Sequence, residues 1–378
     1  MSNMRKVILS VNTSWNVVNF RSGLIKALRS CGYEVSVVAP KDNHSAKLAD
    51  LGCRYIEIAM DNSGMSPFRD IQLAWRYWRV IRQERPDVFI GFTIKPNIFG
   101  SLSAHINGVP VINNISGLGT AFVRGGLLRK IVQALYRYAL YRSKLIFFQN
   151  DDDRVLFVNE GIVREEQTVL LPGSGVDLDH FSPSVDEVPR LNGVVFILVA
   201  RLLWDKGVGE FVEAARLVRE KVPTARFQLL GFLDVENRTA VPRKSLEQWV
   251  DEGLVEYLGS TDDVRPFLQA ADCVVLPSYR EGTPRSLLEG GAMARPLIAT
   301  NVPGCKEVVD HAENGFLCRP KDAADLASKM VEFAAMDYPS RISMGQKSRR
   351  KIEKQFSETI VIERYLSAMQ QILKAEKS

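Results

Sequence analysis

At 378 residues and 42.4 kDa, the chain is long enough for two ordinary domains, each with its own hydrophobic core. Its 46% hydrophobic and 25% charged residues are typical of a soluble globular protein, and no low-complexity run indicates disorder. No apolar stretch approaches the roughly 18 residues that a spanning helix needs. The opening "MSNMRKVILSVN" lacks the long apolar region of a signal peptide, so we expect a cytoplasmic protein.

The cysteines, histidines and charges narrow the classes of partner. The five cysteines include no C-x-x-C pair and the four histidines are scattered, which indicates neither a disulfide framework nor a zinc site. The net charge of +5 is unevenly placed, because residues 65–144 hold 12 Lys or Arg against 3 Asp or Glu. This excess favours an anionic partner, either a phosphate-bearing substrate or a membrane surface. Nucleic acid is disfavoured because no binding motif is recognisable.

Short apolar runs alternate with helix-length amphipathic segments along the first half of the chain. Such alternation is typical of parallel strands that are joined by helices and buried on both faces. We therefore predict a doubly wound, Rossmann-like parallel sheet whose strands lie at residues 6–12, 33–40, 54–59, 87–92, 109–115 and 144–150.

A segment rich in Pro, Asp, Ser and Gly, residues 175–193, interrupts this pattern before it restarts. Strands of a second doubly wound α/β domain are predicted at residues 194–200, 226–231, 255–259, 273–278 and 296–300. We expect an N-terminal domain at 1–185, a C-terminal domain at 186–355, and a last helix at 356–378 that crosses back to the first domain. Two such domains would face each other across a cleft lined by the carboxyl ends of the strands, where open parallel sheets bind ligands.

The stretch "VARLLWDKGVGEF" puts two cations at a strand-to-helix turn. Arg201 follows the strand directly, and Asp205 fits the N-cap of a helix that begins near Gly207. A guanidinium, the ammonium of Lys206 and a helix N-terminus together suit a diphosphate. Taken alone, however, the spacing slightly favours two ordinary surface cations in a solvated turn.

The stretch "YREGTPRSLLEG" has the same strand-to-helix character and carries two carboxylates. Thr283 fits an N-cap and Pro284 the first helical position, so the predicted helix runs from residue 284 to about 295. Glu281 then lies in the loop, and Glu289 lies on the helix. Carboxylates accept hydrogen bonds from paired sugar hydroxyls, and the amides of residues 283–286 suit an anion. The spacing is equally compatible with a loop charge and a surface glutamate.

Taken together, the two stretches resemble a pair of motifs of a known protein family. With "CVVLPSYREGTPRSLLEGGAMARPLIATNVPGCKEVV" and "ENGFLCRP", the chain closely resembles the retaining, sugar-nucleotide-dependent glycosyltransferases of family four, which have the two-lobed GT-B fold. Within that family it looks most like the bacterial capsule and O-antigen branch, which includes N-acetylgalactosaminyltransferases of lipid-linked oligosaccharide assembly. The likeness covers nearly the whole chain and is sharpest from residue 173 to residue 319.

The resemblance implies a role for each matching residue. Arg201 and Lys206 would bind the diphosphate of a UDP-sugar, Glu289 the ribose hydroxyls, and Glu281 the transferred sugar. The remaining donor-side residues that it implies are Gly231, Leu258, Gly282, Thr283, Pro284 and Arg285. It also implies retention of anomeric configuration, a polyprenyl-diphosphate-linked saccharide as acceptor, and an N-acetylhexosamine as the transferred sugar.

The first half departs from the family pattern. The glycine-rich loop after the first strand and the histidine near the fifth are replaced here by "NTSWNVVNFRSG" and "NNISGLGTAF". From the resemblance we place six residues on the acceptor side: Asn19, Arg21, Lys95, Asn97, Ser116 and Gly117, the last two within a turn at 116–119. For each of these the alternative, a helix cap or a turn former, is at least as well supported by the residue type.

Two basic, aromatic helices are predicted in the same half, at residues 69–86 and 126–144. In the first, Arg76, Arg79 and Arg82 recur every third residue beside Trp75 and Trp78. Such helices suit a surface that meets anionic lipid headgroups at the cytoplasmic face of the inner membrane. An ordinary solvated helix face over a core is the equally weighted alternative.

Three acids at residues 151–153 suggest a metal-bound sugar nucleotide, as in the other glycosyltransferase architecture. Asn150 as an N-cap followed by acids in the first helical turn is the simpler interpretation, so we predict no required metal and no other cofactor.

Two rival functions stay open on this fold: a UDP-sugar epimerase or hydrolase, and a UDP-sugar-binding protein without catalysis. A nicotinamide-dependent oxidoreductase is disfavoured because neither domain has a G-x-G-x-x-G turn after its first strand.

Overall fold

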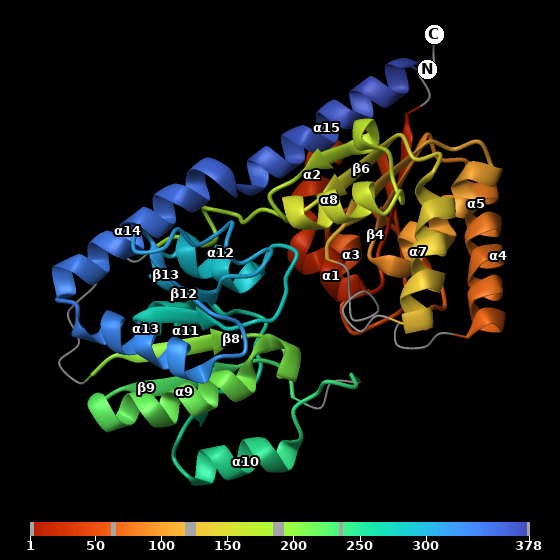
Figure 1. The fold of residues 1–378 in the computed structure, drawn as a ribbon. Helices are drawn as coiled ribbons and strands as arrows, with labels where there is room; N and C mark the ends of the chain where they lie inside the picture. Colours follow the sequence, from red (N-terminus) through yellow and green to blue (C-terminus); the bar gives the residue numbers. More distant parts are fainter. Residues whose placement is uncertain (1–3, 62–65, 118–125, 184–192, 234–236, 376–378) are drawn as a thin grey trace. The chain divides into compact units, whose positions relative to one another are not determined.

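The computed structural model describes residues 4–61, 66–117, 126–183, 193–233 and 237–375. The chain forms two compact units, Met1–Ser174 with Glu358–Ser378, and Gly175–Ser357 (Figure 1). The first change of unit thus falls at Gly175, before the predicted boundary at 185/186, which lies outside the described residues. The second change falls at Glu358, close to the predicted 356.

The first unit is built on a seven-stranded sheet in which every strand pairs in parallel with its neighbours, in the order β3-β2-β1-β4-β5-β6-β7. Its strands are β1 (Lys6–Ser10), β2 (Glu34–Ala39), β3 (Arg54–Glu57), β4 (Val88–Phe92), β5 (Val111–Ile115), β6 (Leu145–Phe148) and β7 (Thr168–Leu170). The six predicted strands are present, and β7 was not predicted. β4 and β5 are buried along their whole length, as the continuous apolar runs indicated.

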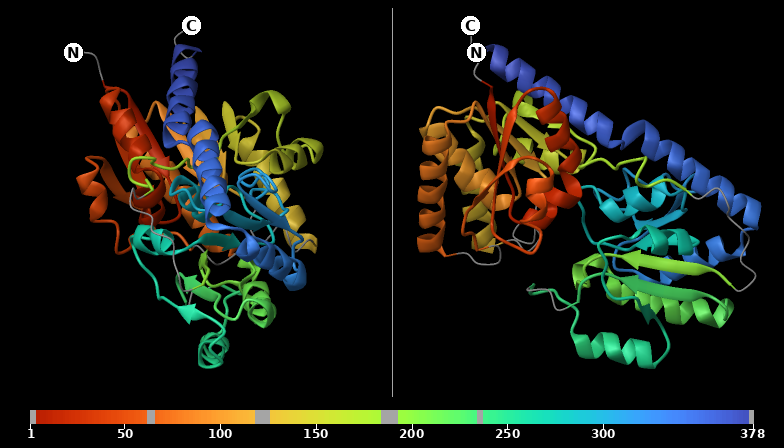
Figure 2. Two further views of the ribbon diagram at one scale, coloured as in Figure 1. Left: turned by 90° about the vertical axis from the view of Figure 1, so that its left-hand side faces the viewer. Right: turned by 180° about the vertical axis from the view of Figure 1, so that it is seen from behind.

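Helices cover both faces of this sheet (Figure 2). They are α1 (Ser14–Phe20), α2 (Ser22–Ser30), α3 (Lys47–Asp50), α4 (Pro67–Glu84), the π-helix η1 (Pro96–Gly100), α5 (Ser101–Ile106), α7 (Gly126–Leu140), α8 (Asp151–Asn159) and α15 (Glu358–Ala375). One core lies between the sheet and α2 with α15, and another lies under α4 and α5. None of the helices that the structure describes has both the length and the apolar character needed to span a membrane.

The last helix, α15, belongs to the first unit although the chain reaches it only after the second. Tyr365 of α15 is fully buried, and its hydroxyl accepts a hydrogen bond of 2.8 Å from the side-chain amide of Asn114. Its ring packs edge-on against Phe147, with 4.8 Å between centroids. Burial raises the pKa of Tyr365 to about 12. A paired polar group inside an apolar interface fixes how the helix docks, because any other register would leave the amide unsatisfied.

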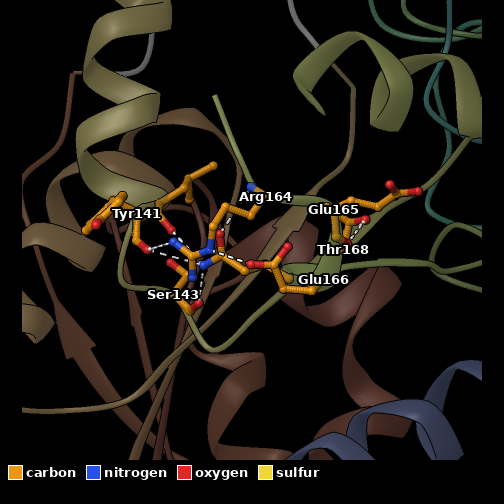
Figure 3. A network of polar contacts seen from close by, with 8 residues as sticks. Tyr141, Ser143, Arg164, Glu165, Glu166 and Thr168 are labelled. Atoms are coloured by element: carbon orange, nitrogen blue, oxygen red, sulfur yellow. Dashed lines mark hydrogen bonds and ion pairs between the residues drawn. The ribbon is translucent and has the colours of Figure 1, made fainter. Parts of the chain in front are cut away.

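Side-chain hydrogen bonds join the segment before β7 to the residues that follow α7 (Figure 3). The Gln167 amide donates to the carbonyl of Ser143 at 2.6 Å, and the guanidinium of Arg164 donates to the carbonyl of Tyr141 at 3.2 Å. Arg164 also pairs with Glu166 at 2.7 Å. This polar network holds the short edge strand in place where few apolar contacts are available.

The three acids at 151–153 begin α8, as the simpler interpretation predicted. The side-chain oxygen of Asn150 accepts a hydrogen bond of 2.8 Å from the amide of Asp153, which is a regular N-cap.

The second unit repeats the architecture with a six-stranded parallel sheet in the order β10-β9-β8-β11-β12-β13. Its strands are β8 (Val195–Val199), β9 (Arg226–Leu230), β10 (Glu256–Tyr257), β11 (Cys273–Leu276), β12 (Leu297–Thr300) and the unpredicted β13 (Gly315–Cys318). Its principal helices are α9 (Val208–Lys221), α10 (Arg243–Asp251), α11 (Arg265–Ala270), α12 (Arg285–Ala292), α13 (Ala323–Ala335) and α14 (Tyr338–Gln355). Separate cores lie on the two faces of the sheet, so both predicted doubly wound sheets are confirmed.

Candidate functional site

The turn after β8 presents Arg201 at the carboxyl edge of the second sheet. Its side chain is exposed and has no hydrogen bond or ion pair within the described ranges. Gly231, which follows the neighbouring strand β9, shapes this turn: its φ is +153°, and a Cβ there would lie 1.8 Å from the carbonyl oxygen of Ala200. The absence of a side chain at Gly231 therefore lets its backbone approach the turn that carries Arg201.

Lys206 and Glu281 meet although 75 positions separate them in the sequence. The ammonium of Lys206 lies 2.5 Å from Oε1 of Glu281, and the same oxygen accepts a hydrogen bond of 2.7 Å from the hydroxyl of Ser278. Both partners are largely buried, with side chains 22% and 11% exposed. β8 and β11 are neighbours in the sheet, which brings the two motifs together at its carboxyl edge.

The predicted cap at Asp205 is wrong. A short 3₁₀ turn, η3 (Trp204–Lys206), precedes α9, and the residue that caps α9 is Gly207 in the left-handed conformation, with φ +72°. A carboxylate cannot cap a helix from within the preceding turn, and Asp205 instead accepts a hydrogen bond of 3.0 Å from the hydroxyl of Thr239. Lys206 therefore stands before a glycine cap, where no side chain competes for the first amides of α9.

The loop that carries Glu281 is held by backbone hydrogen bonds on two sides. The amide of Tyr279 donates to the carbonyl of Asp205 at 3.0 Å, and the amide of Glu281 donates to the carbonyl of Pro303 at 3.1 Å. Gly304, with φ +87°, lets the loop after β12 come within van der Waals contact, since a Cβ there would lie 2.7 Å from the carbonyl carbon of Glu281. Three loops of the second unit thus fix the position of one carboxylate.

The helix after this loop begins one residue later than predicted. α12 starts at Arg285, and Pro284, with extended ψ of 119°, is its N-cap; no side chain caps the helix. Thr283 is therefore a buried loop residue and not the cap. The helix also ends earlier, at Ala292, because Ala294 adopts a left-handed conformation with φ +54°. Glu281 lies outside the helix and Glu289 lies on it, as predicted.

Glu289 is held by Arg285 one turn earlier on the same helix. The guanidinium lies 3.0 Å from Oε1 of Glu289 and also donates to the carbonyl of Gly175. Burial raises the pKa of the Glu289 carboxyl, and the charge of Arg285 offsets part of that rise. Arg285 was predicted as a donor-side residue, and in the structure its side chain orients Glu289.

Other residues at this edge were not predicted from the sequence. The hydroxyl of Tyr279 donates to Glu210 at 2.7 Å, and the ammonium of Lys321 lies 4.8 Å from the centre of the Tyr279 ring. Leu258, which was predicted as a donor-side residue, is half-buried and packs against the core of the second unit. Ser278 is the last residue of the strand predicted at 273–278, and its hydrogen bond to Glu281 was not predicted.

Three of the candidate residues of the first unit are engaged in its own fold. The Asn19 amide donates to the carbonyl of Trp15 at 2.9 Å. Arg21 is buried, with its guanidinium 4.5 Å from the centre of the Phe92 ring. Asn97 is also buried; it donates to the carbonyl of residue 114 and accepts from the amide of residue 113, both at 2.9 Å.

The other candidates of the first unit lie at the ends of strands. Lys95, which follows β4, forms an ion pair of 2.7 Å with Asp70 at the start of α4. Ser116 and Gly117 follow β5, and Gly117 has a positive φ of +124°. The rest of the predicted turn, residues 118 and 119, lies outside the described residues.

Comparison with known proteins gives two family matches. The model described as glycosyl transferases group 1 matches residues 193–335, and the model described as glycosyl transferase 4-like matches residues 6–150.

Two bacterial enzymes are similar in sequence. The N,N'-diacetylbacillosaminyl-diphospho-undecaprenol alpha-1,3-N-acetylgalactosaminyltransferase of Campylobacter jejuni is 29% identical, over 95% of this chain and 96% of that protein. The capsular polysaccharide biosynthesis glycosyltransferase CapM of Staphylococcus aureus is 23% identical, over 98% of each.

Solved structures share the fold along the whole chain. The sucrose-phosphate synthase of Thermosynechococcus elongatus matches with a TM-score of 0.81 at 17% identity, covering 98% of this chain and 100% of that one. Anabaena HepE, solved in complex with UDP, matches with a TM-score of 0.78 at 18% identity, covering 97% and 100%.

Proposed function

Because this chain belongs to the group 1 glycosyl transferases and has the GT-B fold, we propose that it moves a sugar from a UDP-sugar to a saccharide carried on a polyprenyl diphosphate, with retention of anomeric configuration. The observation that carries this proposal is the pairing of Lys206 with Glu281 beside the exposed Arg201. The family and fold were both predicted from the resemblance, and both are confirmed.

The leaving diphosphate is the main electrostatic problem of such a transfer. Negative charge grows on it as the bond to the sugar breaks, and preorganised cations and backbone amides stabilise that charge best when they need not move. Arg201, Lys206 and the first amides of α9 and α12 supply positive charge at one edge of the sheet. We therefore expect no metal requirement.

The two glutamates have separate tasks in this proposal. Glu281, held by Lys206 and Ser278, accepts hydrogen bonds from hydroxyls of the transferred sugar. Glu289, oriented by Arg285, accepts hydrogen bonds from the two ribose hydroxyls of UDP. When the donor binds, its diphosphate accepts hydrogen bonds from the ammonium of Lys206. The ion pair between Lys206 and Glu281 then weakens as the sugar reaches Glu281. Gly231, Leu258 and the turn at 282–284 border the rest of the nucleotide.

The classes of donor and acceptor rest on the relatives. The similar Campylobacter jejuni enzyme is named for transfer of N-acetylgalactosamine to a sugar on diphospho-undecaprenol. A second relative, from Escherichia coli, is a UDP-Gal:alpha-D-GlcNAc-diphosphoundecaprenol alpha-1,3-galactosyltransferase, 26% identical over 71% of each chain. We propose an N-acetylhexosamine as the transferred sugar and bacterial surface polysaccharide or glycan assembly as the process.

A lipid-linked acceptor requires access to a membrane surface, and α4 is the element we propose for it. Phe68, Ile71 and Trp75 recur along one face of α4 and are 71%, 70% and 56% exposed. Arg79 stacks on Trp75 and Arg82 on Trp78, so cations flank the apolar residues. An exposed apolar face with flanking cations suits the headgroup region of an anionic bilayer, here the cytoplasmic face of the inner membrane.

The other basic helix, α7, is a weaker candidate for that surface. Arg129 pairs with Glu160, and Arg137 donates to the backbone carbonyls of Glu160 and Gly161. These cations are occupied within the first unit, so α7 offers less free positive charge to lipid than its sequence indicated.

The proposal is tested by incubating the protein with a panel of UDP-sugars, with and without a bacterial membrane extract. A transferase releases UDP quickly only when both its own donor and the extract are present. A hydrolase releases UDP from the donor alone, an epimerase converts one UDP-sugar into another, and a binding protein does neither; each of these results would contradict the proposal.

A further inference from the structure

A cavity of about 290 Å³ opens in the first unit where α4 begins. Its walls come from the loop after β3, the first turns of α4 and the turn after β4. The polar residues among its lining are Asp61, Arg69, Asp70, Gln72, Arg76 and Lys95. The cavity thus lies at the carboxyl edge of the first sheet, where open parallel sheets place ligands. Its volume is at the small end of small-molecule sites.

Two ion pairs occupy four of the five charged side chains in this cavity. Lys95 pairs with Asp70 at 2.7 Å, with both side chains less than a fifth exposed, and Arg69 pairs with Asp61 at 2.8 Å. The guanidinium of Arg76 donates to a backbone carbonyl, that of residue 59, at 2.8 Å. A diphosphate would have to displace these carboxylates to reach Arg69 and Lys95, and Arg76 is the one lining cation without a carboxylate partner among the described residues. A neutral ligand with many hydroxyls would not displace the carboxylates, because each carboxylate can accept further hydrogen bonds while it stays paired.

The rest of the lining suits a sugar ring. The side chain of Gln72 has no hydrogen bond within the part of the chain that the structure describes, and its amide can both donate to and accept from hydroxyls. Met60 and Leu73 supply apolar surface for the carbon-bound hydrogens of a pyranose. Carboxylate, amide and apolar contacts in one small cavity are the combination that hydroxyl-rich rings require.

The backbone beside the cavity is strained. Thr93, directly after β4, has a φ of +63°, which is rare for a β-branched residue, and its buried hydroxyl has no hydrogen-bond partner among the described residues. The π-helix η1 follows, with Lys95 as its N-cap. Left-handed β-branched residues and π-helical turns both cost stability and concentrate at functional sites. The strained turn places Lys95 against Asp70, which indicates that the cavity has a function.

We propose that this cavity binds one neutral sugar unit of the acceptor, with Asp70 and Gln72 as its hydrogen-bonding partners and Lys95 orienting Asp70. The inference rests on the proposed transferase function, which it extends to the acceptor saccharide. A free glycoside binds the same cavity without any transfer, so the inference is tested separately from the activity.

The test uses the full chain saturated with UDP, so that the donor site is occupied, and methyl glycosides of N-acetylglucosamine and N-acetylgalactosamine as probes. Saturation-transfer NMR measures their binding to the wild type and to Gln72→Ala and Asp70→Asn. We expect each variant to weaken binding about five- to twenty-fold, the value of one or two lost hydrogen bonds. Gln83→Ala, an exposed position on the same helix, is the matched control and should change nothing.

A charge test separates the sugar from a phosphate group. Asp70→Asn removes the carboxylate that pairs with Lys95, so this variant should bind inorganic pyrophosphate more tightly and the glycosides more weakly than the wild type. Tighter pyrophosphate binding to Asp70→Asn, with glycoside binding unchanged, would overturn the inference and assign the cavity to the diphosphate of a lipid carrier. Equal glycoside binding by Gln72→Ala, Asp70→Asn and Gln83→Ala would also overturn it. If a wild type that binds the glycosides transfers no sugar from any UDP-sugar, the transferase proposal fails and the sugar site stands.

Discussion

The carboxyl edges of the two sheets use their polar residues differently. In the second unit the candidates are joined to one another: Lys206 to Glu281, and Arg285 to Glu289. In the first unit, Asn97 and Arg21 are buried and engaged with the fold itself. Both sheets have the same doubly wound character, so topology alone does not decide which polar residues can reach a ligand. A candidate residue is therefore best judged by whether its partner is another candidate or the scaffold.

The largest effect should come from breaking the Lys206–Glu281 pair. Lys206→Ala removes positive charge from the leaving diphosphate, and Glu281→Ala removes the acceptor for sugar hydroxyls while leaving Lys206 without its carboxylate. We expect each to lower kcat by at least about 100-fold, as the loss of a preorganised electrostatic group does elsewhere.

Steady-state kinetics at saturating donor and acceptor measure this effect. Lys221→Ala and Glu220→Ala, exposed positions at the end of α9, are the matched controls. Near-wild-type turnover by both Lys206→Ala and Glu281→Ala would remove the catalytic assignment.

Gly231 tests the geometry that presents Arg201. A Cβ at Gly231 collides with the carbonyl of Ala200, whereas a Cβ at Gly259, also at positive φ, meets nothing within 4 Å. Gly231→Ala should lower the free energy of unfolding by about 2–4 kcal/mol, and Gly259→Ala by only about 1 kcal/mol from backbone conformation. Chemical denaturation followed by circular dichroism compares the two. Equal losses of unfolding free energy in the two variants would mean that the contact between Gly231 and Ala200 does not restrict the residue at position 231.

Glu289 gives a pH-dependent effect of intermediate size. Its pKa is raised in the folded protein by burial, so the fold binds a proton more tightly there than the unfolded chain does. This contribution to stability is fully present below the unfolded pKa of about 4.3 and is lost as pH rises through the folded pKa. Denaturation at a series of pH values should show that loss in the wild type and not in Glu289→Gln.

The same substitution should weaken UDP binding about tenfold at neutral pH, since a charged acceptor for the ribose hydroxyls becomes a neutral one. Isothermal calorimetry measures this. Unchanged UDP affinity would separate Glu289 from the ribose.

The smallest effect concerns the two basic helices. Ile71→Ser with Trp75→Ser on α4 should reduce binding to vesicles that contain anionic lipid about five- to tenfold, because buried apolar area is lost. Tyr138→Ser on α7, 79% exposed in the wild type, is the matched control and should matter less. Vesicle co-sedimentation at two salt concentrations measures both. A larger loss from the α7 change would reverse the assignment of the lipid surface.

Sequence periodicity predicted most of the fold because parallel strands buried on both faces are continuous apolar runs. It missed β7, an edge strand with two of its three residues exposed and therefore no buried apolar run, and it also missed the four-residue strand β13. It also could not foresee that Gly207 in the left-handed conformation, not Asp205, caps α9.

The candidate site was predictable as two motifs, but their contacts were not. The bond from Arg285 to the carbonyl of Gly175 spans 110 positions, and the pairing of Lys206 with Glu281 spans 75. Only the order of strands in the sheet brings such residues together. In the first unit, residue type alone did not separate Asn97, which is buried, from Lys95, which lines a cavity.

In the proposed reaction, a sugar passes from UDP to a lipid-linked saccharide. Its most direct measurement is mass spectrometry of the lipid products, made alongside quantification of UDP, with a purified polyprenyl-diphosphate-linked sugar as acceptor. We expect one UDP for each glycolipid that has gained one N-acetylhexosamine, and a linkage of the same anomeric configuration as the donor. UDP released without a new glycolipid, or a product of inverted configuration, would contradict it.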